Sequence, residues 1–201
     1  VVDTLEAKIP SVAWPNYVLG NHDEPRLATR YGLEPARVAA MLLLTLRGTP
    51  TLYYGDEIGM IDGRIPPDRV QDPWPLRSGM PELARDPCRT PMQWTAGPAA
   101  GFSPPNPDGS IPEPWLPIHP NYKNANVVTE RDDPQSVLNL YRALLRYRRA
   151  TPALTHGSHR SLSGPQDTFV YLRKHESQQR LIALNFSGEE TTVQLPILSG
   201  G

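Results

Sequence analysis

The sequence predicts an α/β protein that ends in an antiparallel β module. Two short apolar segments, 14–20 and 51–54, flank a helical segment, and this β-α-β order is typical of a parallel sheet. After residue 154 the apolar residues recur with a period of two, which favours antiparallel strands. The two parts are separated by a long tract that holds 15 of the 24 prolines, so the fold includes one extended irregular segment.

The first predicted strand runs from Trp14 to Gly20 and ends in the polar cluster Asn21-His22-Asp23. A helix is expected from Pro35 to Arg47, because proline suits the first turn and the apolar residues from Val38 onward recur at helical spacing. Gly48-Thr49-Pro50 ends this helix. The second strand, 51–54, is followed by a loop that contains Asp56 and Glu57.

The proline-rich tract between Pro66 and Pro120 has two interpretations. Such composition is common in disordered linkers. However, this tract also carries three of the four tryptophans, Trp74, Trp94 and Trp115. We therefore expect an ordered excursion over 61–132 that is stiffened by the fixed φ angle of proline and held by aromatic anchors.

A second helix is expected from Asp133 to Arg149, with basic residues in its last turn. Three strands should follow it, at 168–173, 180–186 and 191–195. The change of period places a domain boundary near 152–156. We thus expect one domain over 1–152 and an all-β domain over 153–201.

Charge and cysteine content exclude several classes of protein. The 20 basic and 21 acidic side chains nearly balance, which argues against a nucleic-acid partner. No apolar run has the length of a membrane span, and no signal peptide is visible, so a cytoplasmic location is expected. A single cysteine, Cys88, excludes an internal disulfide and a multi-cysteine metal site. We predict no metal and no cofactor.

Asn21-His22-Asp23 is the first candidate for chemistry, because it follows a parallel strand at the end where α/β barrels place their active sites. A neutral histidine beside an ionised aspartate can hydrogen-bond sugar hydroxyls or orient a general base. The alternative is that these residues merely cap the following turn. Asp56 and Glu57 make a poor acid/base pair, because adjacent residues on a chain point in different directions. A capping role is therefore favoured for them.

Three segments together resemble the α-amylase superfamily, the family 13 glycoside hydrolases. Residues 18–23, Val-Leu-Gly-Asn-His-Asp, resemble its motif at barrel strand 7, and residues 48–60 resemble its motif at strand 8. Residues 86–94 resemble the Arg-Thr-Pro-Met-Gln-Trp block of α-glucosidases, oligo-1,6-glucosidases, sucrose isomerases and trehalose synthases. The resemblance implies the C-terminal part, strands 7 and 8 with their helices, of a TIM (β/α)8 barrel followed by a partial antiparallel β-sandwich domain.

The resemblance also implies roles for individual residues. Asp23 matches the family's carboxylate that stabilises the transition state, and His22 matches a neighbouring ligand of the sugar hydroxyls. Arg89 matches an arginine that closes the cleavage subsite and so favours non-reducing ends. Arg26 is expected to line an outer subsite. The implied activity is that of an α-glucosidase acting on α-glucoside oligosaccharides, and the motifs resemble bacterial members of the family most.

In the family, the nucleophile and the acid/base follow strands 4 and 5, and no matching segment occurs in this sequence. We therefore expect a fragment that is inactive alone and whose partner is the missing N-terminal part of the same barrel. Alternatives are a fragment of a glucosyl-transferring relative (trehalose synthase or sucrose isomerase) and a non-catalytic module of the superfamily. An independent β-rich binding domain with a linker fits the motifs less well.

Overall fold

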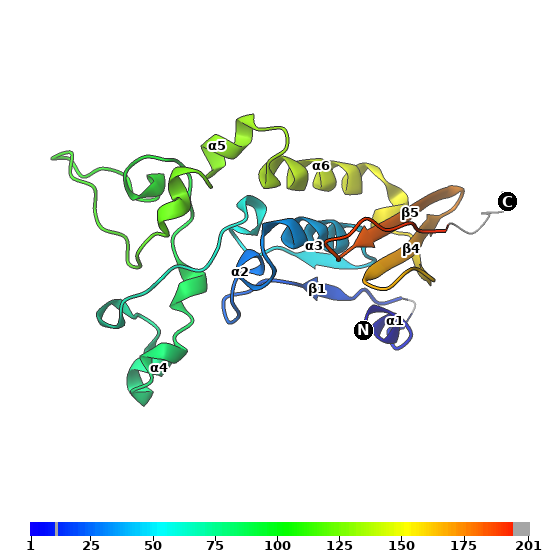
Figure 1. The fold of residues 1–201 in the computed structure, drawn as a ribbon, viewed down its shortest axis with the longest axis horizontal. Helices are drawn as coiled ribbons and strands as arrows, with labels where there is room; N and C mark the ends of the chain where they lie inside the picture. The colour runs from blue at the N-terminus through cyan, green and yellow to red at the C-terminus, as the bar shows by residue number, and fades with distance from the viewer. Residues whose placement is uncertain (11, 195–201) are drawn as a thin grey trace. The chain divides into compact units, whose positions relative to one another are not determined.

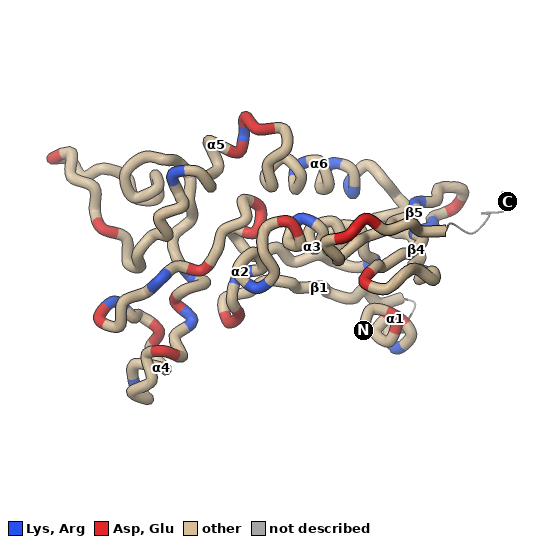
Figure 2. Tube along the Cα trace, in the orientation of Figure 1, with Lys and Arg blue, Asp and Glu red and all other residues tan. Residues whose placement is uncertain are grey.

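The computed structural model (Figure 1) describes residues 1–10 and 12–194. Over these residues the helices and strands are α1 (Val2–Glu6), β1 (Asn16–Val18), α2 (Leu27–Tyr31), α3 (Leu33–Thr45), β2 (Thr49–Thr51), α4 (Pro73–Ser78), α5 (Val127–Asp132), α6 (Val137–Ala150), α7 (Pro152–Thr155), β3 (Ser158–Leu162), β4 (Thr168–His175) and β5 (Gln178–Asn185). Acidic and basic residues are interspersed along the chain (Figure 2). No helix in the described ranges is both long and apolar enough to cross a bilayer.

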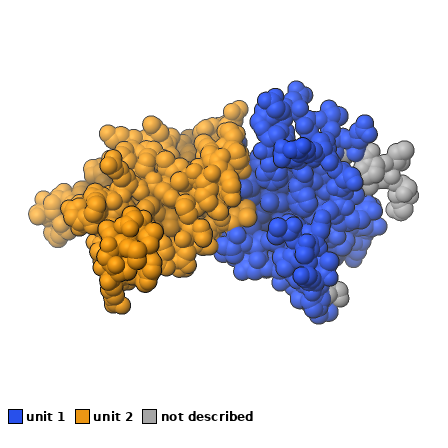
Figure 3. Space-filling model, turned by 60° about the horizontal axis from the view of Figure 1, so that its bottom comes forward, with its two compact units in different colours: residues 1–18, 37–51, 142–201 blue, residues 19–36, 52–141 orange. Residues whose placement is uncertain are grey.

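The described chain divides into two compact units (Figure 3). Unit 1 comprises residues 1–18, 37–51 and 142–201, and unit 2 comprises residues 19–36 and 52–141. The predicted boundary near 152–156 does not separate these units, because the three-stranded sheet β3–β5 shares a core with α3 inside unit 1. The division into domains 1–152 and 153–201 stays a prediction.

A parallel pair of strands is present at the start of the chain, in unit 1, but the second strand is Thr49–Thr51 rather than the predicted 51–54, and the first is shortened to Asn16–Val18. β1 pairs with β2 in parallel, with Tyr17 opposite Pro50. Gly48, which precedes β2, allows the backbone there to lie close to the backbone of Pro15. Its φ is +122°, and a Cβ there would lie 2.4 Å from the carbonyl oxygen of Pro15. The backbone N–H of Thr49 can therefore donate to that same carbonyl at 2.9 Å.

The antiparallel sheet of unit 1 has the order β3-β4-β5, and its core is Leu46, Leu154, Tyr171, Ile182 and Leu184. The prediction of strands at 168–173 and 180–186 is confirmed by β4 and β5. The strand predicted at 191–195 is wrong for 191–194, which form no strand, and Leu195 lies outside the described residues. The third strand is β3 instead, which its polar sequence does not predict. The ring of His159 packs on that of Tyr171, with 5.0 Å between the ring centroids, at a position where an apolar residue is usual.

Two buried arginines complete the C-terminal end of α3, within unit 1. Arg148 donates to the carbonyl oxygens of Leu44 and Leu46 at 2.9 Å and of Gly48 at 2.5 Å. Arg173 donates to the carbonyl oxygen of Thr45 at 2.5 Å. The last carbonyls of a helix have no partner within the helix and carry partial negative charge, so guanidinium groups from α6 and β4 satisfy them.

The proline-rich excursion lies in unit 2. It contains α4 and short 3₁₀ helices at Pro67–Arg69, Pro81–Leu83, Asp86–Arg89, Pro98–Gly101 and Pro120–Lys123. The expectation that tryptophans hold it is wrong: Trp74, Trp94 and Trp115 are 55, 46 and 54% exposed. Hydrogen bonds hold it instead. The hydroxyls of Tyr53 and Tyr54 donate to the carbonyls of Cys88 and Thr90 at 3.1 and 2.7 Å.

Candidate functional site

The loop after β1 positions the candidate site in unit 2. The Oδ1 atom of Asn21 accepts hydrogen bonds from the backbone N–H groups of Asp23 and Glu24, at 2.8 and 3.1 Å. This is an Asx turn, in which a short polar side chain satisfies its own backbone. The turn-capping alternative is therefore correct for Asn21. It leaves the side chains of His22 and Asp23 exposed and available for other contacts.

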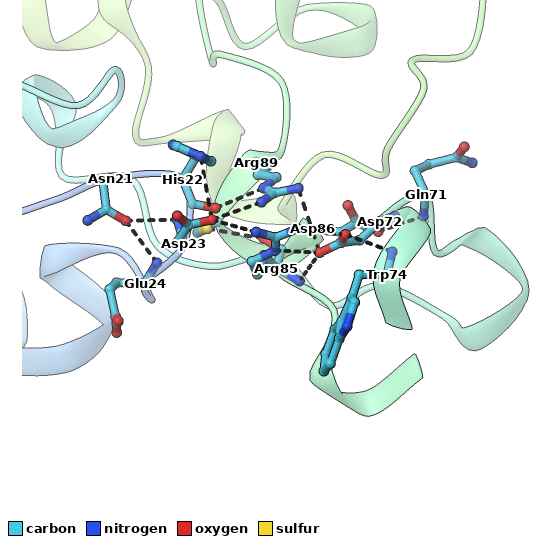
Figure 4. Close-up of polar contacts among 11 residues, drawn as sticks. Asn21, His22, Asp23, Glu24, Gln71, Asp72, Trp74, Arg85, Asp86 and Arg89 are labelled. Atoms are coloured by element: carbon cyan, nitrogen blue, oxygen red, sulfur yellow. Dashed lines mark hydrogen bonds and ion pairs between the residues drawn. The ribbon is translucent and has the colours of Figure 1, made fainter. Parts of the chain in front are cut away.

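The carboxylate of Asp23 is about half exposed and lies beside two arginines, which contact it from the same side (Figure 4). Its Oδ1 atom accepts from Nη1 of Arg85 at 2.7 Å and from Nη2 of Arg89 at 3.3 Å. Nε2 of His22 lies 3.5 Å from the same oxygen. A carboxylate held in this way keeps its orientation while part of it stays open to a ligand.

Arg89 connects the predicted site residues to one another. Its Nε donates to the backbone oxygen of His22 at 2.8 Å, and its Nη1 lies 3.7 Å from the carboxylate of Asp72. The structure thus brings together His22, Asp23 and Arg89, which are 67 positions apart at their widest. Their catalytic roles remain predictions.

The structure does not support the outer-subsite role expected for Arg26. Its side chain is fully buried, its Nη1 donates to the carbonyl oxygen of Tyr54 at 2.7 Å, and its guanidinium lies over the Tyr53 and Tyr54 rings. A group covered in this way has no face left for a sugar. We correct the expectation accordingly: Arg26 supports the tyrosines that hold the excursion.

Sequence reasoning missed Arg85 and Asp72. The side chain of Asp72 is fully buried, and its two oxygens accept hydrogen bonds from Nε and Nη2 of Arg85, at 2.7 and 2.9 Å. These hydrogen bonds from Arg85 hold the pKa of Asp72 well below its usual range, so it is ionised at neutral pH. The only local signal was Asp72-Pro73, which indicates the N-terminus of a helix, and Asp72 does cap α4.

A pocket of about 180 Å³ lies beside Asp23. Its lining includes the carboxylates of Asp23, Glu24, Asp62 and Glu82, together with Arg85. The other half of the lining is apolar, so hydrogen-bond acceptors and apolar groups both face the pocket; these residues are Pro25, Leu83, Ala84, Pro87 and Cys88. A larger pocket of about 610 Å³ lies in unit 1, and none of the predicted site residues lines it. Within residues 1–10 and 12–194, no group of three His, Cys, Asp or Glu residues has a metal-binding arrangement.

Asp56 lies directly behind the Asp23 loop. A Cβ at Gly20 would be 2.7 Å from Oδ2 of Asp56, so any larger residue there would displace the Asp56 carboxyl. The carboxyl of Asp56 is buried, and Oδ1 has no hydrogen-bond partner among the described residues. Burial raises the pKa of Asp56 to about 6, Arg26 opposes the shift, and Glu57 adds to it.

Replacing Asp56 by asparagine should flatten the pH dependence of stability. Because the pKa is raised in the folded state, the unfolded chain ionises first and binds fewer protons between about pH 4 and 6. The free energy of unfolding of the wild type therefore falls across this window, by about 1–3 kcal/mol from this group. Urea unfolding at pH 4.5 and 7.5 measures the fall. Exposed Asp132→Asn is the control, and an equal fall in Asp56→Asn would refute the assignment.

Comparison with known proteins gives a consistent picture. A protein-family model described as the catalytic domain of α-amylase matches residues 1–157. The chain is 36% identical over 199 residues to an α-glucosidase of Apis mellifera, covering 97% of this chain and 34% of the relative. It is 33% identical over 224 residues to a probable oligo-1,6-glucosidase 2 of Bacillus subtilis, covering 98% and 38%.

Solved structures agree with the sequence comparison. An α-glucosyl transfer enzyme, XgtA, superposes with a TM-score of 0.82 at 36% identity, over 94% of this chain and 35% of that one. The chain spans about a third of the length of the curated relatives it matches.

Proposed function

This chain belongs to the α-amylase catalytic-domain family, and from that premise we propose that it carries part of the sugar site of a retaining α-glucosidase-type glycoside hydrolase. The proposed reaction cleaves α-glucosidic bonds at the non-reducing ends of small oligosaccharides. One observation carries the proposal: the exposed carboxylate of Asp23 lies just past the end of a parallel strand, beside His22 and held by two arginines.

In this proposal β1 and β2 are strands 7 and 8 of the family's barrel. TIM-barrel enzymes carry their active sites at the C-terminal ends of the strands, and Asp23 follows the C-terminal end of β1. The two strands are adjacent and parallel, as such an assignment requires. The excursion after β2 then belongs to the loop of strand 8 and contributes Arg89.

Asp23 would act by hydrogen bonding rather than by covalent chemistry. In a retaining glycosidase the sugar ring flattens toward an oxocarbenium ion, and hydrogen bonds to its hydroxyls strengthen in that state. Interactions that are stronger in the transition state raise kcat. His22 would bind a further hydroxyl, and Arg89 would close the subsite below the sugar.

Retention of configuration needs two further carboxyl groups about 5–5.5 Å apart, one as nucleophile and one as acid/base. We propose that both come from barrel strands outside residues 1–201. The chain then supplies binding and transition-state stabilisation but no bond-breaking group. Its proposed partner is the remaining part of the same barrel.

The purified 201-residue chain should therefore release no glucose from p-nitrophenyl α-glucoside or maltose. A coupled glucose assay measures this, and a parallel preparation of Asp23→Asn gives the background from host enzymes. A chimera that carries residues 1–201 in place of the matching third of the Bacillus subtilis relative is the positive control. Turnover by the pure chain above the Asp23→Asn background would contradict the division of roles proposed here.

A second candidate is transfer of glucose to another sugar, because one structural neighbour is described as an α-glucosyl transfer enzyme. Hydrolysis and transfer share the first half of the reaction and differ in whether water or a sugar hydroxyl attacks the intermediate. Assaying the chimera with and without an acceptor sugar distinguishes them. Glucose release equal to p-nitrophenol release indicates hydrolysis, and a deficit of glucose indicates transfer.

A further inference from the structure

The carboxylate of Asp23 has contacts on only one of its two oxygens. Nη1 of Arg85, Nη2 of Arg89 and Nε2 of His22 all lie within 3.5 Å of Oδ1. Among residues 1–10 and 12–194, no hydrogen bond to Oδ2 of Asp23 is present. One oxygen is thus held by the protein, and the other is left open on a half-exposed side chain.

Arg85 makes the shorter of the two arginine contacts to Asp23, and its hydrogen bonds to Asp72 fix its own orientation. Its Nε and Nη2 donate to the two oxygens of Asp72, at 2.7 and 2.9 Å, which leaves Nη1 directed at Asp23. A bidentate pair of this kind fixes the plane of the guanidinium group. Arg89 differs, since its shortest bond is to the backbone oxygen of His22.

Asp72 is a rigid support for this arrangement. Its side chain is fully buried, and it also accepts from the backbone N–H of Arg85 at 3.2 Å. Its own backbone N–H and that of Gln71 donate to the buried carboxylate of Asp86, at 2.9 and 2.6 Å. A continuous chain of bonds therefore runs from Asp86 through Asp72 and Arg85 to Asp23, as Figure 4 shows.

We propose that Arg85, oriented by Asp72, is a positioning residue for Asp23. Arg85 holds Oδ1, and Oδ2 remains free to accept a hydroxyl of the bound sugar. The identity of that ligand rests on the proposed function, whereas the positioning itself does not. Neither Arg85 nor Asp72 touches the sugar in this proposal, and the two act by fixing one rotamer of Asp23 before a ligand binds.

The test measures three-bond couplings across the χ1 bond of Asp23 by NMR in the 201-residue chain. The wild type should show the couplings of one rotamer. Arg85→Lys should show averaged couplings, because a single ammonium group cannot bond both oxygens of Asp72 and also reach Asp23. Arg69→Lys is the matched control, since Arg69 lies in the same excursion and pairs with Glu113 at 2.6 Å. This control should leave Asp23 unchanged.

A second measurement needs no variant. At one and the same pH, the Nε–H of Arg85 should exchange with solvent more slowly than that of the exposed Arg77, because it donates to the buried carboxylate of Asp72 at 2.7 Å. Averaged Asp23 couplings in the wild type, or one rotamer in folded Arg85→Lys, would overturn the proposal. Titration of the chimera with glucose separates the two claims, because the chimera carries the complete barrel. If the resonances of His22 and Asp23 do not respond there, the proposed function fails while the couplings still decide the positioning role.

Discussion

Asp23→Asn, in the chimera that carries residues 1–201, is expected to lower kcat by about 100- to 1000-fold and to change KM much less. The substitution keeps the shape of the side chain but removes its charge. A carboxylate gains most when positive charge develops on the sugar, so the loss falls on the transition state rather than on the bound substrate. Steady-state kinetics with p-nitrophenyl α-glucoside separate the two constants.

The matched control for this result is Asp68→Asn, an exposed aspartate of the same excursion. It should leave both constants within about twofold of the wild type, as surface changes away from a site usually do. An unchanged kcat in Asp23→Asn would remove Asp23 from its proposed role. A rise in KM with kcat retained would assign it to ground-state binding instead.

The candidate site shows which of its residues sequence patterns can predict and which they cannot. The position of Asp23 was predictable, because a polar cluster follows an apolar strand and the strand period is local information. Its neighbours Arg85 and Asp72 were not, because they lie 62 and 49 positions away and meet Asp23 only after the excursion folds back. The pair Asp72-Pro73 is typical of a helix N-terminus, and this local pattern says nothing of the hydrogen bonds from Arg85 to Asp72.

The fold shows the same division between local and tertiary information. The helices α3 and α6 and the strands β4 and β5 follow from periodicity. β3 was missed because the side chain that it covers against the sheet is polar: His159 packs on the ring of Tyr171. The tryptophans of the excursion were expected to be its anchors, yet the tyrosines Tyr53 and Tyr54 hold it through their hydroxyl groups. Hydrophobicity alone does not reveal which aromatic residues form such bonds.

The second large effect concerns stability rather than catalysis. Arg148→Met should lower the free energy of unfolding by about 3–5 kcal/mol. The substitution leaves the carbonyl oxygens of Leu44, Leu46 and Gly48 without their donor at the buried end of α3. Each buried polar group that loses its partner costs about 1–3 kcal/mol.

Two effects of Arg148→Met raise the free energy of unfolding, and their size relative to the lost hydrogen bonds decides the net change. Burial lowers the pKa of Arg148, so removing its charge relieves a desolvation cost. The pKa of Arg173 is lowered to about 10, mainly by burial and then by the charge of Arg148, so the loss of Arg148 also relieves a repulsion. Neither effect restores a donor to the three carbonyls, and Arg173 donates to the carbonyl of Thr45 instead. We therefore expect the loss to dominate.

Urea unfolding followed by circular dichroism measures the change. The control is Arg146→Met, which makes the same substitution on the exposed side of α6 and should change stability by less than about 0.5 kcal/mol. If Arg148→Met were no more destabilising than this control, the end of α3 would be stabilised by its apolar contacts rather than by the guanidinium group. In that case Leu46, which lies in the core shared with the sheet, would carry the attachment of α3 to β4 and β5.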